Sequence, residues 1–270
     1  MKNYDKSYCK EYVSYKKELL KSKIKELRVK PFLCIIQVGD LFASNKYVQG
    51  KIKDCEEVGI CVELKKYEDT VTEEALIKEI EISNELYDGI IVQLPLPKHI
   101  NVNNIQKAID DKVDVDGFKS SSIFYPCTPL GIFNLLNEVT DLNGKHVVIL
   151  GRSEIVGKPM ANLLIEKSNA TVSICNSHTP DISYYTKQAD IIISAVGKAK
   201  LITKDMVKEN CIVIDVGINR DEDGKMCGDV DYDAIQELCE FITPVPGGIG
   251  LITRLTLLEN TFLANQTFFE

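Results

Sequence analysis

Short apolar runs rich in β-branched residues alternate along this 270-residue chain with stretches of helical spacing. The first half contains PFLCIIQV, a weaker CVELKKYE and GIIVQLPLP; the second contains KHVVILG, ATVSIC, ADIIISAVG and CIVIDVGI. Most of these runs are continuously apolar, which is typical of parallel strands buried on both faces. Because strands and helices alternate, we predict an α/β fold with helices on both sides of parallel sheets.

A polar break, NEVTDLNGK at residues 137–145, follows a predicted helix and precedes the VVILG strand. We therefore predict two α/β domains, residues 1–139 and 140–253. The last apolar stretch, LTLLENTFLANQTFF, has helical spacing, and we expect a helix over 254–270 to pack back onto the first domain. Within that domain we predict a helix from Ser44 to Val58, with Ser44 as its N-cap and Gly59 as its C′ residue.

Composition narrows the function classes. The formal charge of −8 argues against nonspecific binding to nucleic acid or anionic membranes. No apolar run approaches the roughly 18 residues of a membrane-spanning helix, and the polar, Lys-rich start is unlike a secretory signal. Nine scattered cysteines, several within apolar runs, indicate reduced core thiols in a cytoplasmic protein. With three histidines and no clustered cysteines, we expect no metal site.

The segment KHVVILGRSEIVGKPMANLLIEKSNATVSIC predicts a strand, a turn, a helix and a second strand. Gly151 ends the first strand, and Gly157 and Pro159 open the helix, where proline suits the first turn. Such a turn presents backbone N–H groups and a helix N-terminus to a phosphate. The spacing from Gly151 to Gly157 differs from the G-x-G-x-x-G fingerprint, so a plain strand–helix connection is the alternative.

Neighbouring side chains favour a phosphorylated nucleotide. Arg152 and Ser153 follow the first strand, and residues 176–179 (Asn-Ser-His-Thr) follow the second without the acidic residue that accepts from a free ribose 2′-OH. This set suits the 2′-phosphate of NADP. The alternative for Arg152 is a solvated surface charge. The predicted strands ADIIISAVG and CIVIDVGI lead into Gly197 and Gly217, at the sheet edge where open α/β folds bind ligands.

Candidate catalytic residues lie in the first half. Tyr47 and Lys51 are four residues apart on one face of a predicted helix, where the tyrosine can hold the amine for acid–base work. The same spacing also occurs on plain solvated faces. Gln93 interrupts an apolar strand, and a buried amide must be hydrogen-bonded, so it faces either a site or a polar partner in the core.

Two loops complete the candidate set. Asp114 and Asp116 flank a valine in a turn in which Gly117 permits a positive φ. This is either an Asx-turn alone or a turn that aims Asp116 at a heterocycle with adjacent N–H donors. The PVPGGIG loop, residues 244–250, lets backbone approach a ligand closely, or else merely connects two domains.

Taken together, these stretches resemble the bifunctional methylenetetrahydrofolate dehydrogenase/methenyltetrahydrofolate cyclohydrolase family (the FolD family). The matching segments occur in the family's order between about residues 32 and 261. They are SNKYVQGKIKDCEEVGI, DGIIVQLPLP, DKVDVDGF, PCTPLGI, GKHVVILGRSEIVGKPMANLL, ADIIISAVGK, VIDVGIN, GDVD and TPVPGGIG followed by LLENT.

The resemblance implies a folate-binding catalytic domain, a Rossmann NADP-binding domain and an active site in the cleft between them. It implies oxidation of 5,10-methylenetetrahydrofolate with NADP, hydrolysis of the methenyl product to 10-formyltetrahydrofolate, a homodimer, and one-carbon metabolism serving purine and amino-acid biosynthesis. The implied catalytic residues are Lys51, Tyr47 and Gln93. The implied substrate-binding residues are Tyr47, Lys51, Val92, Gln93, Leu94, Asp116, Pro246, Gly247, Gly248, Ile249 and Gly250. The implied cofactor-binding residues are Gly151, Arg152, Ser153, Ser177 and Ile218.

Three departures from the family pattern affect the folate side. The usual His-Pro-x-Asn-x-Gly-x-Leu stretch is replaced by the shorter segment 119–125, the usual Gly-Pro-Met-Thr becomes residues 250–253 followed by Arg254, and the N-terminal Gly-Lys segment is missing. Alternatives are therefore an enzyme with one of the two activities, another two-domain NADP dehydrogenase related to shikimate dehydrogenase, and a non-catalytic folate-binding protein.

Overall fold

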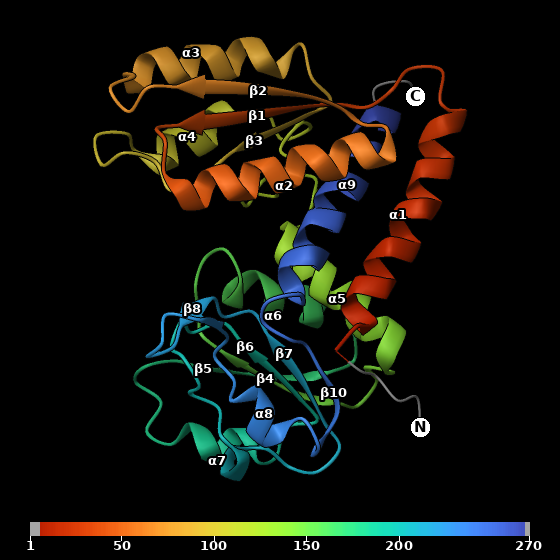
Figure 1. Cartoon of the computed structure of the whole chain (residues 1–270), viewed down its shortest axis with the longest axis vertical. Helices are drawn as coiled ribbons and strands as arrows, with labels where there is room; N and C mark the ends of the chain where they lie inside the picture. The colour runs from red at the N-terminus through yellow and green to blue at the C-terminus, as the bar shows by residue number, and fades with distance from the viewer. Residues whose placement is uncertain (1–5, 268–270) are drawn as a thin grey trace. The chain divides into compact units, whose positions relative to one another are not determined.

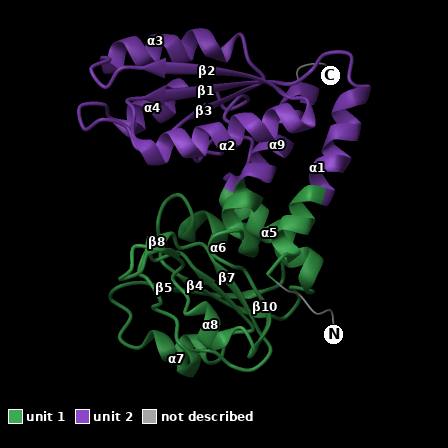
Figure 2. Ribbon diagram, in the orientation of Figure 1, with its two compact units in different colours: residues 1–14, 128–253 green, residues 15–127, 254–270 purple. Residues whose placement is uncertain are grey.

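The computed structural model describes residues 6–267; positions 1–5 and 268–270, which include the end of the helix expected over 254–270, lie outside the described part. The chain forms two compact units (Figure 2). Unit 1 comprises residues 1–14 and 128–253, and unit 2 comprises residues 15–127 and 254–270. No helix within residues 6–267 is both long enough and apolar enough to cross a membrane.

Unit 2 is built on a three-stranded parallel sheet in the order β2-β1-β3 (Figure 1). Its strands are β1 (Phe32–Val38), β2 (Cys61–Tyr67) and β3 (Gly89–Val92). Its helices are α2 (Phe42–Val58), α3 (Glu73–Asn84) and α4 (Val102–Ala108), with most of α1 (Tyr8–Glu26) and of α9 (Ile249–Thr267).

Alternate residues of β1 point to opposite faces of this sheet, as the two-residue period of a strand requires. Leu33 and Ile35 are buried in one cluster with residues of α2 and with Leu257 and Leu258 of α9. The residues between and beyond them, 34, 36 and 38, are buried in a second cluster with residues of α3 and α4. A strand with apolar contacts on both faces explains why PFLCIIQV is continuously apolar.

Unit 1 contains a five-stranded parallel sheet in the order β10-β7-β6-β4-β5 and a two-stranded antiparallel ribbon (Figure 1). One buried hydrophobic cluster in this unit contains residues of the sheet and residues of the segments that pack against it. The strands are β4 (His146–Leu150), β5 (Thr171–Cys175), β6 (Ile191–Ser194), β7 (Cys211–Asp215), β8 (Asn219–Arg220), β9 (Met226–Cys227) and β10 (Cys239–Ile242). The helices are α5 (Cys127–Val139), α6 (Gly157–Lys167), α7 (Ile182–Thr186) and α8 (Tyr232–Ile235), with a 3₁₀ turn at Lys204–Met206.

The predicted α/β class with parallel sheets is confirmed, and each of the seven predicted runs contains a strand. Strands β8, β9 and β10 were not predicted. Strands β8 and β9 have only two residues each, and the four residues of β10, CEFI, include a glutamate that interrupts the apolar run. The predicted start of α2 is wrong. The helix begins at Phe42, and its N-cap is Leu41, which has no side chain able to cap; Ser44 is buried within the first turn.

Contacts divide the chain at 127/128, at the start of α5, whereas the sequence placed a boundary after residue 139. Gly59 ends α2 with φ +91°, in the left-handed conformation expected of a C′ glycine. Residues 254–267 of α9 contribute to the core of unit 2: Asn260 donates from Nδ2 to the Val115 carbonyl at 2.8 Å. Asn265 donates to the Asp88 carboxylate at 3.1 Å.

Candidate active site

Helix α2 carries two of the predicted catalytic residues. Its buried positions, including Val48, Cys55 and Val58, pack against the sheet of unit 2. Lys51 is half-buried, and its Nζ donates a hydrogen bond to Gln93 Oε1 at 3.2 Å. Tyr47, one turn earlier, is 40% exposed. The structure therefore brings Lys51 and Gln93 together across 42 residues of sequence and leaves the tyrosine ring accessible beside them on the helix.

Gln93 lies just beyond β3 and not within a strand, which corrects the prediction. The strand ends at Val92, but the Gln93 backbone N–H still donates to the Ile36 carbonyl at 2.8 Å. Its side-chain Nε2 donates to the Leu94 carbonyl at 2.7 Å, so the amide orientation leaves Oε1 to accept from Lys51. The Leu94–Pro95 peptide bond is cis.

A second glutamine, at the end of β1, was missed by the sequence analysis. Gln37 is 2% exposed and donates from Nε2 to Asn45 Oδ1 at 2.6 Å, near the start of α2. Ile36 pairs with Val92, so the two glutamines extend from the carboxyl ends of neighbouring strands. A polar residue at the end of an apolar run was the available signal, and it applied to Gln37 as much as to Gln93.

The two aspartates of the DVDG turn have different roles. Asp114 is fully buried, and its carboxylate accepts from the backbone N–H groups of Phe118 at 2.9 Å and Lys119 at 3.0 Å. Burial raises its pKa, while these hydrogen bonds act in the opposite direction. Asp116 is only partly buried. A Cβ at Gly117, where φ is +64°, would lie 2.5 Å from Pro126 N. The turn is thus held by Asp114 and leaves Asp116 accessible.

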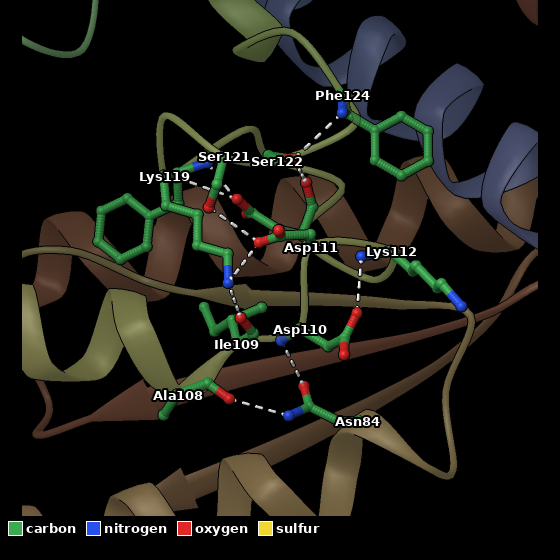
Figure 3. Close-up of polar contacts among 12 residues, drawn as sticks. Asn84, Ala108, Ile109, Asp110, Asp111, Lys112, Lys119, Ser121, Ser122 and Phe124 are labelled. Carbon is green, nitrogen blue, oxygen red and sulfur yellow. Dashed lines mark hydrogen bonds and ion pairs between the residues drawn. The ribbon is translucent and has the colours of Figure 1, made fainter.

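The shortened segment 119–125 is anchored by its own polar contacts (Figure 3). Lys119 pairs with Asp111 at 2.6 Å and also donates to the Ile109 carbonyl. Ser121 Oγ donates to the Asp111 carboxylate at 3.0 Å, and Ser122 Oγ donates to the Asp114 carbonyl at 3.0 Å. The replacement is therefore a folded turn attached to the same aspartate-rich loop that carries Asp116.

Arg254, the other departure, lies against α2. Its Nε is 2.9 Å from Asp54 Oδ2, and a Cβ at Gly50 would lie 2.1 Å from its Nη1. Asp54 Oδ1 is 2.6 Å from Lys17 Nζ, and Lys17 is 2.7 Å from Glu57. Burial lowers the pKa of Lys17, but its hydrogen bonds to the two carboxylates outweigh this and raise it. We call these four charged residues the α2 ion cluster; it joins α2 to α1 and α9.

In unit 1, the turn after β4 has the shape expected of a phosphate-binding loop. Gly151 has φ +104°, and a Cβ there would lie 2.4 Å from the Ala195 carbonyl oxygen. A Cβ at Gly157, the first residue of α6, would lie 2.2 Å from the Gly151 carbonyl oxygen. Ser153 Oγ accepts from the N–H groups of Val156 and Gly157 at 3.2 and 3.4 Å. Only glycine fits at either glycine position of this turn.

The side chains around that turn fit a phosphorylated cofactor. Arg152 is exposed and has no ion-pair partner within residues 6–267. Ser177 is exposed at the end of β5, the edge strand that pairs with β4. Residues 176–179 contribute no carboxylate there. A free guanidinium and hydroxyl donors without an acidic neighbour match the 2′-phosphate of NADP.

The remaining predicted residues also lie in unit 1. Ile218 is 56% exposed and lies in the loop after β7, directly before β8. Residues 246–248 lie in the loop that leads into α9, and residues 249–250 are the first of that helix; the Val245–Pro246 peptide bond is cis, and Gly247 has φ +102°. A Cβ at Gly248 would lie 2.4 Å from the Pro244 carbonyl oxygen. The predicted substrate-binding residues thus belong partly to unit 2 and partly to this segment of unit 1.

Two carboxylates at the same sheet edge were missed as site residues. Asp215 ends β7 with an exposed fraction of 3%, and Asp229 has none. Both belong to segments that carry the family resemblance, VIDVGIN and GDVD. An acidic residue within two positions of a glycine in an apolar context was the signal that could have identified them.

Comparisons with known proteins agree with this geometry. Residues 8–116 match the family described as tetrahydrofolate dehydrogenase/cyclohydrolase, catalytic domain, and residues 126–268 match its NAD(P)-binding domain. The bifunctional protein FolD of Bacillus cytotoxicus is 49% identical over 251 residues, which cover 88% of this chain and 87% of that protein.

Solved structures give the same result. The bifunctional FolD enzyme of Campylobacter jejuni superposes with a TM-score of 0.93 and 44% identity, over 96% of this chain and 97% of the other. The Trypanosoma brucei methylenetetrahydrofolate dehydrogenase-cyclohydrolase, complexed with NADP cofactor and inhibitor, gives a TM-score of 0.90 and 30% identity over 97% of both chains.

The fold and these matches define a two-domain NADP-dependent enzyme of folate one-carbon units. The chain belongs to the tetrahydrofolate dehydrogenase/cyclohydrolase family. It oxidises 5,10-methylenetetrahydrofolate with NADP and hydrolyses the 5,10-methenyl product to 10-formyltetrahydrofolate. The alternatives of a single retained activity and of a shikimate dehydrogenase relative are not favoured.

Proposed function

We propose that Lys51 is the catalytic residue of the two folate reactions, with Gln93 and Tyr47 supporting it. The observation that carries this proposal is the hydrogen bond from Lys51 Nζ to Gln93 Oε1 at 3.2 Å. That bond fixes the direction of one N–H of the lysine. The other positions on Nζ are then free to exchange a proton with a reacting group.

The substrate-binding residues that we propose are Val92, Gln93, Leu94, Asp116, Tyr47 and Lys51 of unit 2, and residues 246–250 of unit 1. Asp116 is the acceptor for adjacent N–H donors of the pterin ring, because a carboxylate accepts two parallel hydrogen bonds well. Its neighbour Asp114 is occupied by backbone donors, which supports the choice of Asp116. The exposed ring of Tyr47 offers a face for the flat heterocycle.

The proposed cofactor site consists of Gly151, Arg152, Ser153, Ser177 and Ile218. The two glycine contacts in the β4–α6 turn and the unpaired guanidinium support it. When bound, NADP supplies the acceptor for the hydride that leaves the one-carbon bridge.

The hydrolytic step follows from the same lysine. Water adds to the cationic methenyl carbon and loses a proton. The hydroxyl group of the adduct then loses its remaining proton as one carbon–nitrogen bond breaks, which leaves the formyl group on the other nitrogen. The nitrogen that leaves takes up a proton, so one water is consumed and one proton is released. Lys51 is the group that we propose carries the proton between water and nitrogen.

Three broader assignments are part of the proposal. Residues 1–139 with helix 254–270 serve as the folate-binding domain, and residues 140–253 serve as the NADP-binding domain. The protein acts as a cytoplasmic homodimer, in agreement with its composition and family. Its 10-formyltetrahydrofolate supports purine and amino-acid biosynthesis.

The test is an assay with methylenetetrahydrofolate and NADP that follows the methenyl absorbance as it appears and decays. We expect the wild type to show both phases and Lys51→Met to lose the decay of supplied methenyltetrahydrofolate. Lys53→Met, an exposed lysine on the same helix, is the matched control. Wild-type turnover by Lys51→Met would refute the assignment of the lysine.

A further inference from the structure

Asp215 and Asp229 form a pair of buried carboxylates that the proposed reaction does not use. Their exposed fractions are 3% and 0%. Neither forms an ion pair with any residue between 6 and 267. A buried carboxylate without a cation is costly unless its oxygens accept several hydrogen bonds. The groups that donate hydrogen bonds to these oxygens therefore identify the segments that the two carboxylates hold in place.

Asp229 collects five donors from two loops at the carboxyl edge of the sheet. The backbone N–H groups of residues 196–198, directly after β6, donate to it at 2.7, 3.3 and 2.9 Å in chain order. Ser194 Oγ, at the end of β6, donates at 3.1 Å. Asn219, the first residue of β8 after the loop that follows β7, donates from Nδ2 at 2.8 Å. One carboxylate thus connects the loop after β6 to the loop after β7.

Asp215 holds Asp229 itself. Its Oδ1 accepts from the N–H groups of Gly217 and Asp229 at 3.0 Å each, and its Oδ2 accepts from Val230 N–H at 2.9 Å. The two carboxylates lie so close to the backbone that no side chain fits beside them. A Cβ at Gly217 would lie 2.1 Å from Asp229 Oδ1, and one at Gly228 would lie 1.8 Å from Asp215 Oδ2.

The loops that are held in this way border the proposed cofactor site. Ile218 lies between Gly217, which donates to Asp215, and Asn219, which donates to Asp229. In the strand order, β6 and β7 lie on the side of β4 away from β5, which is followed by Ser177. A dinucleotide that crosses the carboxyl edge with its adenosine end at β4 and β5 has its nicotinamide end at β6 and β7.

From these contacts we infer that Asp229, supported by Asp215, is a positioning residue for the nicotinamide end of NADP. It sets the backbone of residues 196–198 and of Ile218 so that both loops can bind the cofactor. This role rests on the proposed cofactor site. It predicts that weakening Asp229 harms NADP binding and spares the hydrolysis, which needs no cofactor.

The test is Asp229→Asn in the full-length protein, with both activities measured. The amide keeps the shape of the carboxylate but replaces one accepting oxygen by an NH₂ group that faces N–H donors. We expect the KM for NADP to rise about tenfold to hundredfold, as the loss of one or two hydrogen bonds to a charged acceptor implies. The rate on supplied methenyltetrahydrofolate should stay within about twofold of wild type.

Asp190→Asn is the matched control. Asp190 precedes β6 at the opposite, amino edge of the sheet, accepts from His146 N–H at 2.8 Å and pairs with Lys208 at 2.6 Å. Its substitution should leave the KM for NADP unchanged. If Asp229→Asn does not fold, Asn219→Ala removes a single donor and leaves the others, and a smaller rise in the KM for NADP is then expected.

Three outcomes would overturn the inference: an unchanged KM for NADP in Asp229→Asn, equal losses of both activities, or equal effects of Asp229→Asn and Asp190→Asn. The wild type separates this inference from the proposed function. An inactive wild type contradicts the proposed function. An active wild type whose variants keep their affinity for NADP contradicts only the positioning role.

Discussion

The α2 ion cluster offers a quantitative test of how the helix that carries Lys51 is held in place. In Asp54→Ala, Lys17 keeps Glu57, but Arg254 loses the carboxylate 2.9 Å from its Nε. That nitrogen is buried and has no well-aligned hydrogen bond to any residue between 6 and 267, so the contact with Asp54 is its electrostatic compensation. The Asp54 side chain is 8% exposed and that of Arg254 is 24% exposed.

Removing one partner of a fully buried pair costs about 3–5 kcal/mol. Because Arg254 is partly solvated and Lys17 retains one partner, we expect Asp54→Ala to lower the free energy of unfolding by about 2–3 kcal/mol. Arg254→Met leaves Asp54 paired with Lys17 and should cost less. The double variant should be more stable than the sum of the two single effects predicts, with a coupling of about 1–2 kcal/mol.

Equilibrium unfolding of the full chain in urea, followed by two spectroscopic probes, measures these values, since a chain with two units need not unfold in one step. Asp40→Ala is the control: its pair with Lys66 is exposed, with side-chain fractions of 76% and 44%, and its loss should change the free energy of unfolding much less than the loss of Asp54. An Asp54→Ala variant as stable as Asp40→Ala, or singles that add without coupling, would refute the reasoning.

Three further predictions use other contacts. Gly50→Ala should destabilise the wild type, because its Cβ would lie 2.1 Å from Arg254 Nη1. In the Arg254→Met background the same change should stabilise the protein by up to about 1 kcal/mol through helix propensity. Urea unfolding with and without Gly50→Ala, in each background, tests this. Gly157→Ala places a Cβ 2.2 Å from a backbone oxygen. We expect this variant to lose NADP binding, measured by calorimetry, and to keep its hydrolytic activity. A normal affinity for NADP would contradict the proposed phosphate-binding turn. Burial raises the pKa of Asp215 from 3.8 to about 6, so the folded protein binds a proton there at a higher pH than the unfolded chain. The wild type should therefore gain stability relative to Asp215→Asn as the pH falls from about 7 to about 5, and a pH-independent difference would contradict this.

Much of the fold was predictable because parallel strands covered on both faces have a distinctive sequence pattern. Because alternate residues of β1 are buried in two different apolar clusters, the segment PFLCI contains no polar residue. Each of the seven apolar runs recognised in the sequence contains a strand. Strands such as β8, with two residues, have no room for a pattern. The start of α2 was misplaced because Leu41 provides no capping side chain, whereas Ser44 resembles a cap.

The candidate site was predictable where residues carry local signals. Lys51 and Tyr47 share a helix face, and Gln93 is conspicuous in an apolar run. The contact of Asp54 with Arg254 joins residues 200 positions apart, and no local pattern connects them. The carboxylate of Asp229 likewise acts on loops 10 to 35 residues away, so its role depends on the sheet order.

The position of α9 at the end of the chain has a consequence for the order of folding during synthesis. Leu257, Leu258 and Ala264 are buried in the core that β1 and α2 begin to build, and Asn260 binds the carbonyl of Val115. A ribosome therefore releases the whole of residues 128–253 before the last helix can complete the first sheet's core. All the strands of unit 1 are synthesised before this part of α9. We therefore expect unit 1 to reach its native packing first, and unit 2 to complete its core only after the last turns of α9 are made.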